Sequence, residues 1–405
     1  MGAKQQGART FDRPIVVPFS PDQPPEFFSQ FPATPAVFAL RGAESGSEPY
    51  VSKTASLRRR LQRLLAPAET QSKRLNLRER VAHIEYSLTG SDFESALLLY
   101  RLLRQEFPET YQKRLRLHPA PVIKLNLENA YPRAYVTTRL GRAGAQSLYY
   151  GPFRSRGVAE KFMNDSLDLF KVRRCTFELH PDPGFPGCVY SEMKMCLAPC
   201  FKGCTDEAYA AEVARVHAYF DTGGESLIAE LEAERDQLSA ALDFEAAAQQ
   251  HAKIMKVKSI LSGADEICRR LDKLDAVMIQ PSNEKDTAAL FRFHQGALLG
   301  PASLRIAVES EAQAEPLAQS LCAALDALIP TRPPSVTQTT EELAILKRWY
   351  YRSHRTGEII FAKPDGELPM RKLLNAANRI VDPKMQTETT THTKVDEQSK
   401  NQAPS

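Results

Sequence analysis

Five cysteines lie close together between residues 175 and 204, and their side chains are the strongest candidates for chemistry in this chain. Twelve, seven and three residues separate the first four, which are Cys175, Cys188, Cys196 and Cys200; Cys204 follows four positions later. Four thiolates that converge on one point indicate a metal or iron–sulfur site, because each sulfur needs a nearby cation to stay deprotonated. Disulfides and unbonded core cysteines are the alternatives that the spacing leaves open.

The composition of the chain favours the metal over the disulfides. The first residues, MGAKQQGARTFDRP, are polar and lack the apolar run of a signal peptide, so we expect a reducing, cytoplasmic setting. No stretch approaches the ~20 apolar residues of a membrane span. A length of 405 residues is enough for several domains.

Charge is divided unevenly along the sequence, although the net charge is only +4. Residues 1–174 contain 28 Lys and Arg against 16 Asp and Glu, whereas residues 175–405 contain 25 against 33. A basic half joined to an acidic half suggests a polyanionic partner for the first half. A solvated basic surface without a ligand is the alternative.

The amino-terminal part is predicted to be a disordered basic tail over residues 1–25, followed by a small α+β domain over residues 30–116. Two short strand-like runs, PAVFAL and PYVSK, precede a helix with four leucines on one face. The rest of that helix carries basic side chains. With Lys53, which precedes it, they form the candidate DNA-binding set: Lys53, Arg58, Arg59, Arg60 and Arg63.

Four further regions follow. Residues 117–224 contain a strand, a Gly-Pro turn with a helix, and the cysteine segment; residues 225–262 form a helical hairpin. The apolar faces of its two arms cannot bury each other fully, so they need a partner surface inside or outside the chain. Residues 266–383 alternate like strands and then like helices, and residues 384–405 have the polar composition of a disordered tail.

Three blocks of this sequence resemble the UvrC family of excinucleases, the incision proteins of bacterial nucleotide-excision repair, and their shorter relative Cho. PAVFAL…PYVSK lies where that family has its GIY…YIG hairpin. YYGPF at 149–153 and CLAPC at 196–200 match the family's middle region, and LDFEAAA at 242–248 matches its UVR motif. The resemblance covers about residues 30–265, and more weakly 266–380.

The resemblance implies a fold and a set of partners. The fold is α+β and multidomain: a GIY-YIG-like α/β/α domain, a cysteine-cluster region, a UVR helical hairpin and a carboxy-terminal α+β region. Cys175, Cys188, Cys196 and Cys200 would hold a 4Fe-4S cluster, with zinc as the alternative, and Cys204 would be dispensable. The chain would bind double-stranded DNA. The hairpin would dock a UvrB-like protein through Leu242, Phe244, Glu245 and Ala247, with Phe244 as a buried anchor; the alternative for Phe244 is a core residue that seals the turn.

The nuclease residues of the family are only partly kept. Tyr50, Lys53 and Arg60 match its second tyrosine, its basic residue and its helix arginine. Four other positions differ, with Phe38 and Leu64 in place of tyrosines, Tyr100 in place of the metal-binding glutamate, and Gln112 in place of an asparagine. A tyrosine hydroxyl is a poor Mg²⁺ ligand, because hard cations prefer anionic oxygen. We therefore expect the GIY-YIG-like site to be inactive.

Full-length members of the family continue into an RNase H-like nuclease and helix-hairpin-helix motifs, and we expect both to be missing from this sequence. The leading interpretation is a repair protein that binds DNA and a UvrB-like partner without cutting. An active Mg²⁺-dependent, structure-selective endonuclease that uses Glu94 or Tyr50 in new roles is the first alternative. An iron–sulfur redox sensor with no DNA partner is the second.

Overall fold

The computed structural model describes residues 14–44, 46–67, 75–141, 147–306 and 314–382. The predictions for residues 1–13 and 383–405 lie outside these ranges. The chain divides into two compact units. Unit 1 combines residues 1–117, 275–332 and 352–405, and unit 2 combines residues 118–274 and 333–351. The region expected at 266–383 is thus divided between the two units.

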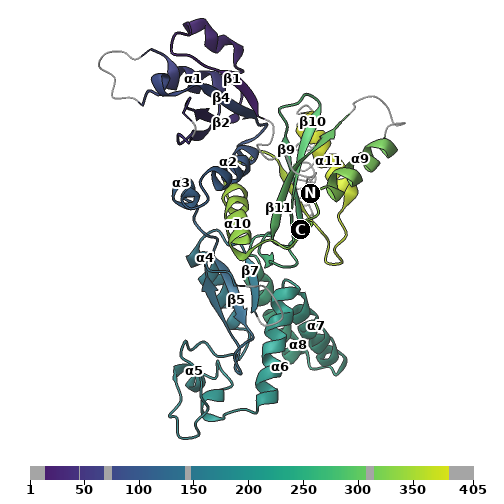
Figure 1. The fold of residues 1–405 in the computed structure, drawn as a ribbon. Helices are drawn as coiled ribbons and strands as arrows, with labels where there is room; N and C mark the ends of the chain where they lie inside the picture. The colour runs from purple at the N-terminus through teal and green to yellow at the C-terminus, as the bar shows by residue number, and fades with distance from the viewer. Residues whose placement is uncertain (1–13, 45, 68–74, 142–146, 307–313, 383–405) are drawn as a thin grey trace, which may run out of the picture. The chain divides into compact units, whose positions relative to one another are not determined.

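Unit 1 contains an amino-terminal antiparallel sheet with the strand order β1-β4-β2-β3 (Figure 1). Its strands are β1 (Ile15–Pro18), β2 (Ala36–Arg41), β3 (Tyr50–Thr54) and β4 (His83–Leu88). The disorder predicted for residues 1–25 is wrong where the structure describes this stretch, because β1 pairs with β4 along its whole length. The short IVVP run is a weak predictor of a strand by itself, since the strand with which it pairs lies almost 70 residues later.

The helices of this part are η1 (Pro25–Gln30), α1 (Leu57–Leu65), η2 (Arg78–Arg80), α2 (Asp92–Glu106) and α3 (Tyr111–Leu115). All four leucines of α1 are buried, as their spacing predicted. The Ser91 hydroxyl accepts a hydrogen bond of 3.1 Å from the backbone N–H of Glu94, which fixes the start of α2.

A second antiparallel sheet in unit 1 has the order β11-β10-β9-β12. Its elements are β9 (Ala276–Pro281), β10 (Thr287–His294), β11 (Ala297–Arg305), β12 (Glu358–Phe361), α9 (Ala314–Asp326) and α11 (Met370–Val381). Side chains of α9 and α11 form one core with one face of this sheet. The α2 helix contacts the sheet through Phe93, whose ring lies 5.0 Å from that of Phe291, and through Arg101, which donates to the Leu298 carbonyl at 3.0 Å.

Unit 2 is built on a third antiparallel sheet, with the order β6-β5-β7-β8. Its elements are β5 (Val122–Asn126), β6 (Arg133–Thr137), β7 (Ser147–Gly151), α4 (Arg156–Leu167), α5 (Val189–Glu192), η3 (Pro199–Phe201), α6 (Asp206–Asp221), α7 (Glu225–Ala240), α8 (Phe244–Leu261), β8 (Arg269–Arg270) and α10 (Val336–Tyr350). One face of the sheet shares a core with α4, α6 and the hairpin. The mixed, multidomain α+β class is confirmed.

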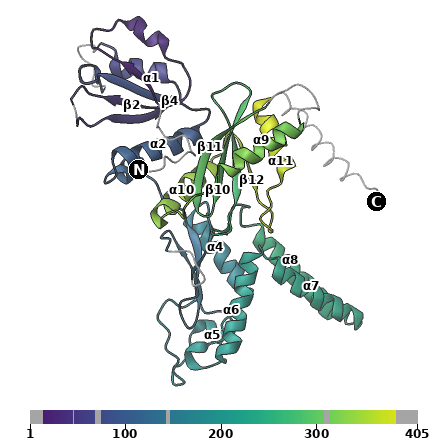
Figure 2. The same cartoon turned by 45° about the vertical axis from the view of Figure 1, so that its right-hand side comes forward.

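Helices α7 and α8 form the hairpin predicted for residues 225–262 and run side by side away from the sheet of unit 2 (Figure 2). Only the base of the hairpin is part of the core, through Leu227, Leu231, Ile254 and Val257. The turn between the arms has Leu242 in the left-handed region, at φ 61°, and Asp243 caps α8 by accepting from the Ala246 N–H. The outer part of the hairpin therefore has no packing partner within the described chain.

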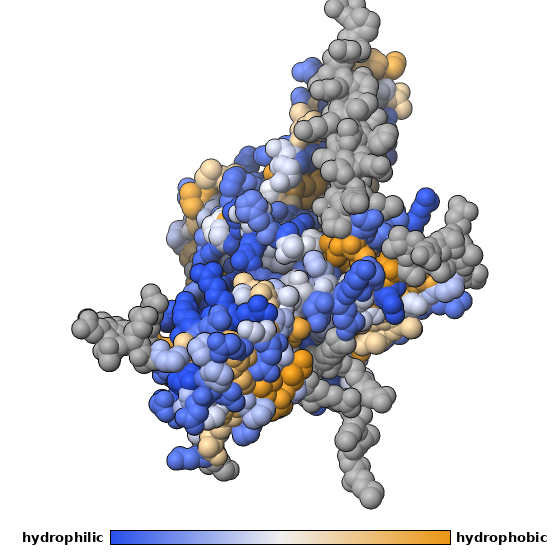
Figure 3. Space-filling view, turned by 90° about the horizontal axis from the view of Figure 1, so that it is seen from above, coloured by the Kyte–Doolittle hydropathy of each residue, from blue (hydrophilic) through white to orange (hydrophobic). Residues whose placement is uncertain are grey.

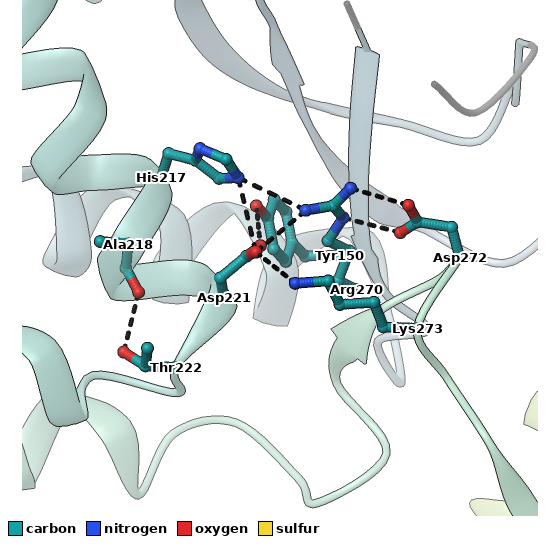
Figure 4. A network of polar contacts seen from close by, with 8 residues as sticks. All are labelled: Tyr150, His217, Ala218, Asp221, Thr222, Arg270, Asp272 and Lys273. Carbon is teal, nitrogen blue, oxygen red and sulfur yellow. Dashed lines mark hydrogen bonds and ion pairs between the residues drawn. The ribbon is translucent and has the colours of Figure 1, made fainter. Parts of the chain in front are cut away.

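A polar network fixes both ends of the hairpin (Figure 4). The carboxylate of Asp221, at the end of α6, accepts from the Tyr150 hydroxyl at 2.8 Å and from Arg270 and Lys273 at 2.9 Å each. Burial alone would raise the pKa of Asp221, but the hydrogen bonds from Lys273 and Tyr150 and the charges of Arg270 and His217 lower it below its ordinary value. The segments just before α7 and just after α8 are thereby joined to the sheet.

The face of the molecule seen in Figure 3 is mostly hydrophilic, with hydrophobic residues gathered in smaller patches. In the part of the chain that the structure describes, no helix combines the length and apolar character needed to cross a membrane.

We predict that Asp221→Asn lowers the free energy of unfolding at pH 7 by about 1–3 kcal/mol, because it removes an anion that three donors share. The estimate lies below that for a fully buried pair because Lys273 is mostly exposed. A carboxylate with a lowered pKa contributes stability above its unfolded pKa of ~3.9 and loses it as the pH falls through its folded value. Denaturant titrations should therefore show the difference from wild type at pH 7 and a smaller one below about pH 4.

Asp236→Asn is the matched control, because its partner Arg235 is its neighbour in sequence and the pair is on the surface of α7. Equal losses for the two variants, or a difference that does not change on acidification, would contradict the role assigned to Asp221.

Candidate functional site

The four cysteines with the expected spacing line one pocket in unit 2. Cys188 directly precedes α5, and Cys200 lies in η3. Cys204 does not line this pocket and instead packs against the core of the unit. The structure thus brings together the four residues that the family resemblance singled out and separates the fifth from them.

Turns, rather than a helix, bring these cysteines together. The four-residue spacing of Cys196 and Cys200 would place them one turn apart on one face of an α-helix, but the segment between them is not α-helical. Ala198 between them is in the left-handed region, at φ 57°, and Pro199 begins a new 3₁₀ turn. Lys194 and Lys202 are also left-handed, at φ 56° and 59°. Such conformations are uncommon for residues other than glycine, so the segment folds back repeatedly around the pocket.

Burial raises the pKa of two of the pocket thiols, Cys196 and Cys200. Burial, together with the neighbouring cysteine charges, raises the pKa of the Cys196 thiol to about 11. Across residues 14–44, 46–67, 75–141, 147–306 and 314–382, no three His, Cys, Asp or Glu side chains already have the arrangement of a metal site. Binding a metal would therefore require the four sulfurs to lose protons and draw closer together.

Arg173 is a further residue of this pocket that sequence reasoning missed. It is 3% exposed, and its guanidinium donates to the Cys175 sulfur at 3.7 Å and to the Phe177 carbonyl at 3.2 Å. Its buried Nε has no hydrogen-bond partner, and no carboxylate in the described residues forms an ion pair with it. A buried cation without an anion is costly. The residues of this pocket therefore fit an anionic metal–thiolate group, and the RRC run at 173–175 was the available signal.

Two of the three residues retained from the nuclease motifs, Tyr50 and Arg60, meet on the α1 face of the amino-terminal sheet. The third, Lys53, pairs across the strands with Val37 of the opposite face. Phe38 is fully buried, and its ring lies 6.2 Å from that of Tyr50 in a core shared with α1. The Tyr50 hydroxyl accepts a hydrogen bond of 2.7 Å from Arg60. Leu64 is in the same core. Tyr50 and Arg60 are thus in contact, as their roles would require.

The opposite face of this sheet packs against α2 through Leu98 and Leu102. Tyr100 lies two residues from each of these leucines, about 200° around the helix, and so faces away from the sheet. It is 1% exposed and packs near Tyr111, with its hydroxyl accepting from Arg104 at 3.1 Å. The structure therefore does not bring position 100 to the face that holds Tyr50 and Arg60.

Two other polar residues bear on the nuclease motif. Glu94 has a structural contact, and Gln112 lies outside the sheet and its packed helices. The buried Glu94 carboxylate accepts a hydrogen bond of 2.8 Å from the Gly90 N–H, where it helps to cap α2. Gln112 is exposed on α3. Neither position supplies a carboxylate beside Tyr50.

The predicted basic set is divided among different environments. Arg58 donates to the backbone carbonyls of Phe31 and Ser29, at 2.7 and 3.2 Å, and Lys53 forms an ion pair with Asp92. Only two members are exposed, Arg59 and Arg63, which lie one helical turn apart on α1.

The four residues expected to bind a partner protein lie at the outer end of the hairpin. Leu242 is 73% exposed and Phe244 is 65% exposed, so Phe244 does not seal the turn within this chain. Glu245 is also exposed, whereas Ala247 is buried between the arms. Two large apolar side chains at a solvent-exposed tip are unusual and suggest a contact surface.

Comparison with known proteins shows where this chain is similar to others. The family model described as UvrC/Cho excinuclease, middle domain, matches residues 120–219, a range that contains all four pocket cysteines. No solved structure gives a significant match.

Three curated relatives named UvrABC system protein C illustrate the similarity. The protein from Solibacter usitatus is 31% identical over 271 residues, covering 65% of this chain and 42% of its own length. The proteins from Dehalococcoides mccartyi and Methanothermobacter thermautotrophicus are 24% and 27% identical, covering 67% and 81% of this chain and 44% and 54% of their own lengths. The chain thus spans about half the length of these relatives. The middle-domain match and the relatives together show that this chain is a UvrC-like protein.

Proposed function

We propose that this chain acts in nucleotide-excision repair by binding DNA and a UvrB-like protein, and that its GIY-YIG-like domain does not cut DNA. The observation that carries the second part is the separation of the motif residues by the amino-terminal sheet. Tyr50 and Arg60 are on the α1 face, while position 100 is on the far side of α2. A metal-dependent nuclease needs a carboxylate to place the cation beside the groups that hold water and phosphate.

The core packing of this domain supports the same conclusion. Phe38 and Tyr100 each have almost no exposed surface, so neither presents a polar atom to a substrate cleft. Glu94, the residue that an altered active site would recruit, is occupied in capping α2. An active endonuclease would need to break that cap, and no contact in the described residues favours this alternative.

We predict that the full chain does not incise DNA at this domain. The assay offers nicked, bubble and lesion-bearing duplexes with UvrB present, at saturating Mg²⁺ or Mn²⁺, and resolves the products on a denaturing gel. Wild type and Arg60→Ala should be equally silent. Site-specific products that disappear on Tyr50→Phe or Arg60→Ala would show that the domain is a live nuclease.

We also propose that the cysteine pocket holds a metal–thiolate group. Cys175, Cys188, Cys196 and Cys200 would be its ligands, and an iron–sulfur cluster or a zinc ion would replace their protons. Four thiolates around either group leave a net negative charge. Arg173 would supply the compensating cation, because it is buried against Cys175 and lacks any carboxylate partner among the described residues.

We predict that chain purified without oxygen contains bound iron or zinc, and that Cys196→Ser lowers the metal per chain at least several-fold. Cys204→Ser is the matched control and should leave the metal content unchanged, because this side chain lies outside the pocket. Arg173→Gln should also lower the amount of bound metal, since it removes the compensating positive charge and leaves all four cysteine ligands in the sequence. Metal analysis and absorbance spectra provide the readout. Metal-free wild-type protein with free thiols would contradict this assignment.

The hairpin tip provides the proposed contact with the UvrB-like partner. Its exposed apolar pair, Leu242 and Phe244, is held at a fixed turn by the left-handed Leu242 and the Asp243 cap. Rigid aromatic side chains at such positions are typical anchors of protein interfaces. The acidic Glu245 beside them would give the contact its polar rim.

We predict that Phe244→Ala weakens binding of the full chain to UvrB by about 30-fold or more, the scale expected for an interface anchor. Thermal stability should be unchanged, because the side chain is exposed in the free chain. Met255→Ala is the matched control, since Met255 is also an exposed apolar side chain of α8 but lies three turns from the tip. Calorimetric titrations in which both variants bind like wild type would rule out the tip as the docking site.

A further inference from the structure

The sheet of unit 2 has a second face, opposite the core that it shares with α4 and α6. Ile123, Leu125, Ala134 and Val136 point into the core shared with α4 and α6. Side chains alternate along strands, so the residues between them lie on the opposite face. On that face Lys124 is directly paired with Tyr135 of β6 and with Tyr149 of β7, which places the three side chains in one row across the sheet.

Cations stack on the tyrosines of this row. The Lys124 ammonium lies 5.7 Å from the Tyr149 ring centroid and 6.0 Å from that of Tyr135. The Arg133 guanidinium lies 4.9 Å from the Tyr135 ring centroid. Lys124, Arg133 and Tyr135 are each half-buried, so part of each side chain reaches the surface. We call these three residues the tyrosine–cation face. Tyr149 is buried beneath it, with its hydroxyl accepting from the Gly141 N–H.

No acidic side chain among the described residues neutralises the charges of the tyrosine–cation face. Neither Lys124 nor Arg133 forms an ion pair or a side-chain hydrogen bond with any described residue. The nearest carboxylate along the sequence, Glu128, instead accepts a hydrogen bond of 2.8 Å from Ser147. Two cations held close together on a shared aromatic ring, without an anion, form a surface that suits a ligand supplying both negative charge and a flat apolar group.

We propose that the tyrosine–cation face binds single-stranded DNA. Lys124 and Arg133 contact phosphates, and an unpaired base stacks on the Tyr135–Arg133 pair. A single strand is favoured over a duplex because the faces of duplex bases are covered by their neighbours, whereas an unpaired base offers a free π-face to an aromatic ring or a guanidinium plane. The inference rests on the DNA binding proposed above and assigns it a second surface, in a different unit from Arg59 and Arg63.

Fluorescence anisotropy of the full chain with an oligothymidylate of about 12 nucleotides tests this surface, since such sites span about 4–16 nucleotides. Tyr135→Leu should weaken binding about 5- to 150-fold, the range measured for loss of one stacked base. Tyr135→Phe is the matched control and should bind like wild type, because it keeps the ring. Lys124→Gln changes a side chain that forms no hydrogen bond or ion pair with any described residue, and it should lower the salt slope by about one unit.

The outcomes separate this inference from the function on which it rests. Duplex binding that is lost in the Arg59→Ala, Arg63→Ala double variant but kept in Tyr135→Leu would support two distinct surfaces. Binding of oligothymidylate that is unchanged by both Tyr135→Leu and Lys124→Gln would overturn the inference and leave duplex binding intact. Binding of no DNA of either kind would overturn the proposed function as well. Tighter binding of oligouridylate, or of an acidic peptide, would reassign the face to RNA or protein.

Discussion

The arrangement of unit 2 depends on one carboxylate. Asp221 receives hydrogen bonds from a strand of the sheet, through Tyr150, and from the segment after the hairpin, through Arg270 and Lys273. The two ends of a long hairpin would otherwise be joined to the unit only through the base of the hairpin, by apolar packing and by the ion pair between Arg215 of α6 and Glu230 of α7. Because several donors converge on a single anion, the base cannot shift without leaving buried charges unpaired. The hairpin can therefore project its tip into solvent while its base remains part of the core.

The amino-terminal domain and the cysteine segment both carry family motifs, but they differ in whether the motif residues stabilise the fold. In the amino-terminal domain, three of the four positions that differ from the family motif, Phe38, Leu64 and Tyr100, are apolar or aromatic and lie in the core, so the domain gains packing where a cleft would need polar groups. In the cysteine segment the opposite has happened. Left-handed backbone and a buried arginine are both unfavourable by themselves, and a bound anionic group would offset them. Residues whose burial or backbone conformation destabilises the fold in the absence of a ligand indicate function more strongly than residues that improve core packing.

Much of the local structure follows from the sequence, because periodicity and capping act over a few residues. The leucine spacing of α1, the Ser91 cap of α2 and the two arms of the hairpin were all predictable in this way. The pairing of β1 with β4 was not, since it depends on a distant strand. The path between Cys196 and Cys200 was not predictable either, because spacing alone cannot reveal a left-handed Ala198. The sequence also cannot show that Arg173 is buried without a carboxylate partner among the described residues, because this depends on the fold.

The position of Arg173 bears on how long the protein would persist in a cell. With an anionic group bound in the cysteine pocket, as proposed above, the charge of the buried guanidinium would be neutralised and the surrounding turns would be held in place. Once that group is lost to oxidation, the same charge opposes burial, and the turns at Lys194, Ala198 and Lys202 have nothing to offset their strain. The segment would then open locally and become accessible to proteases well before the rest of the fold unfolds. Oxidative damage to the centre would thus be converted into a shorter lifetime of the whole chain.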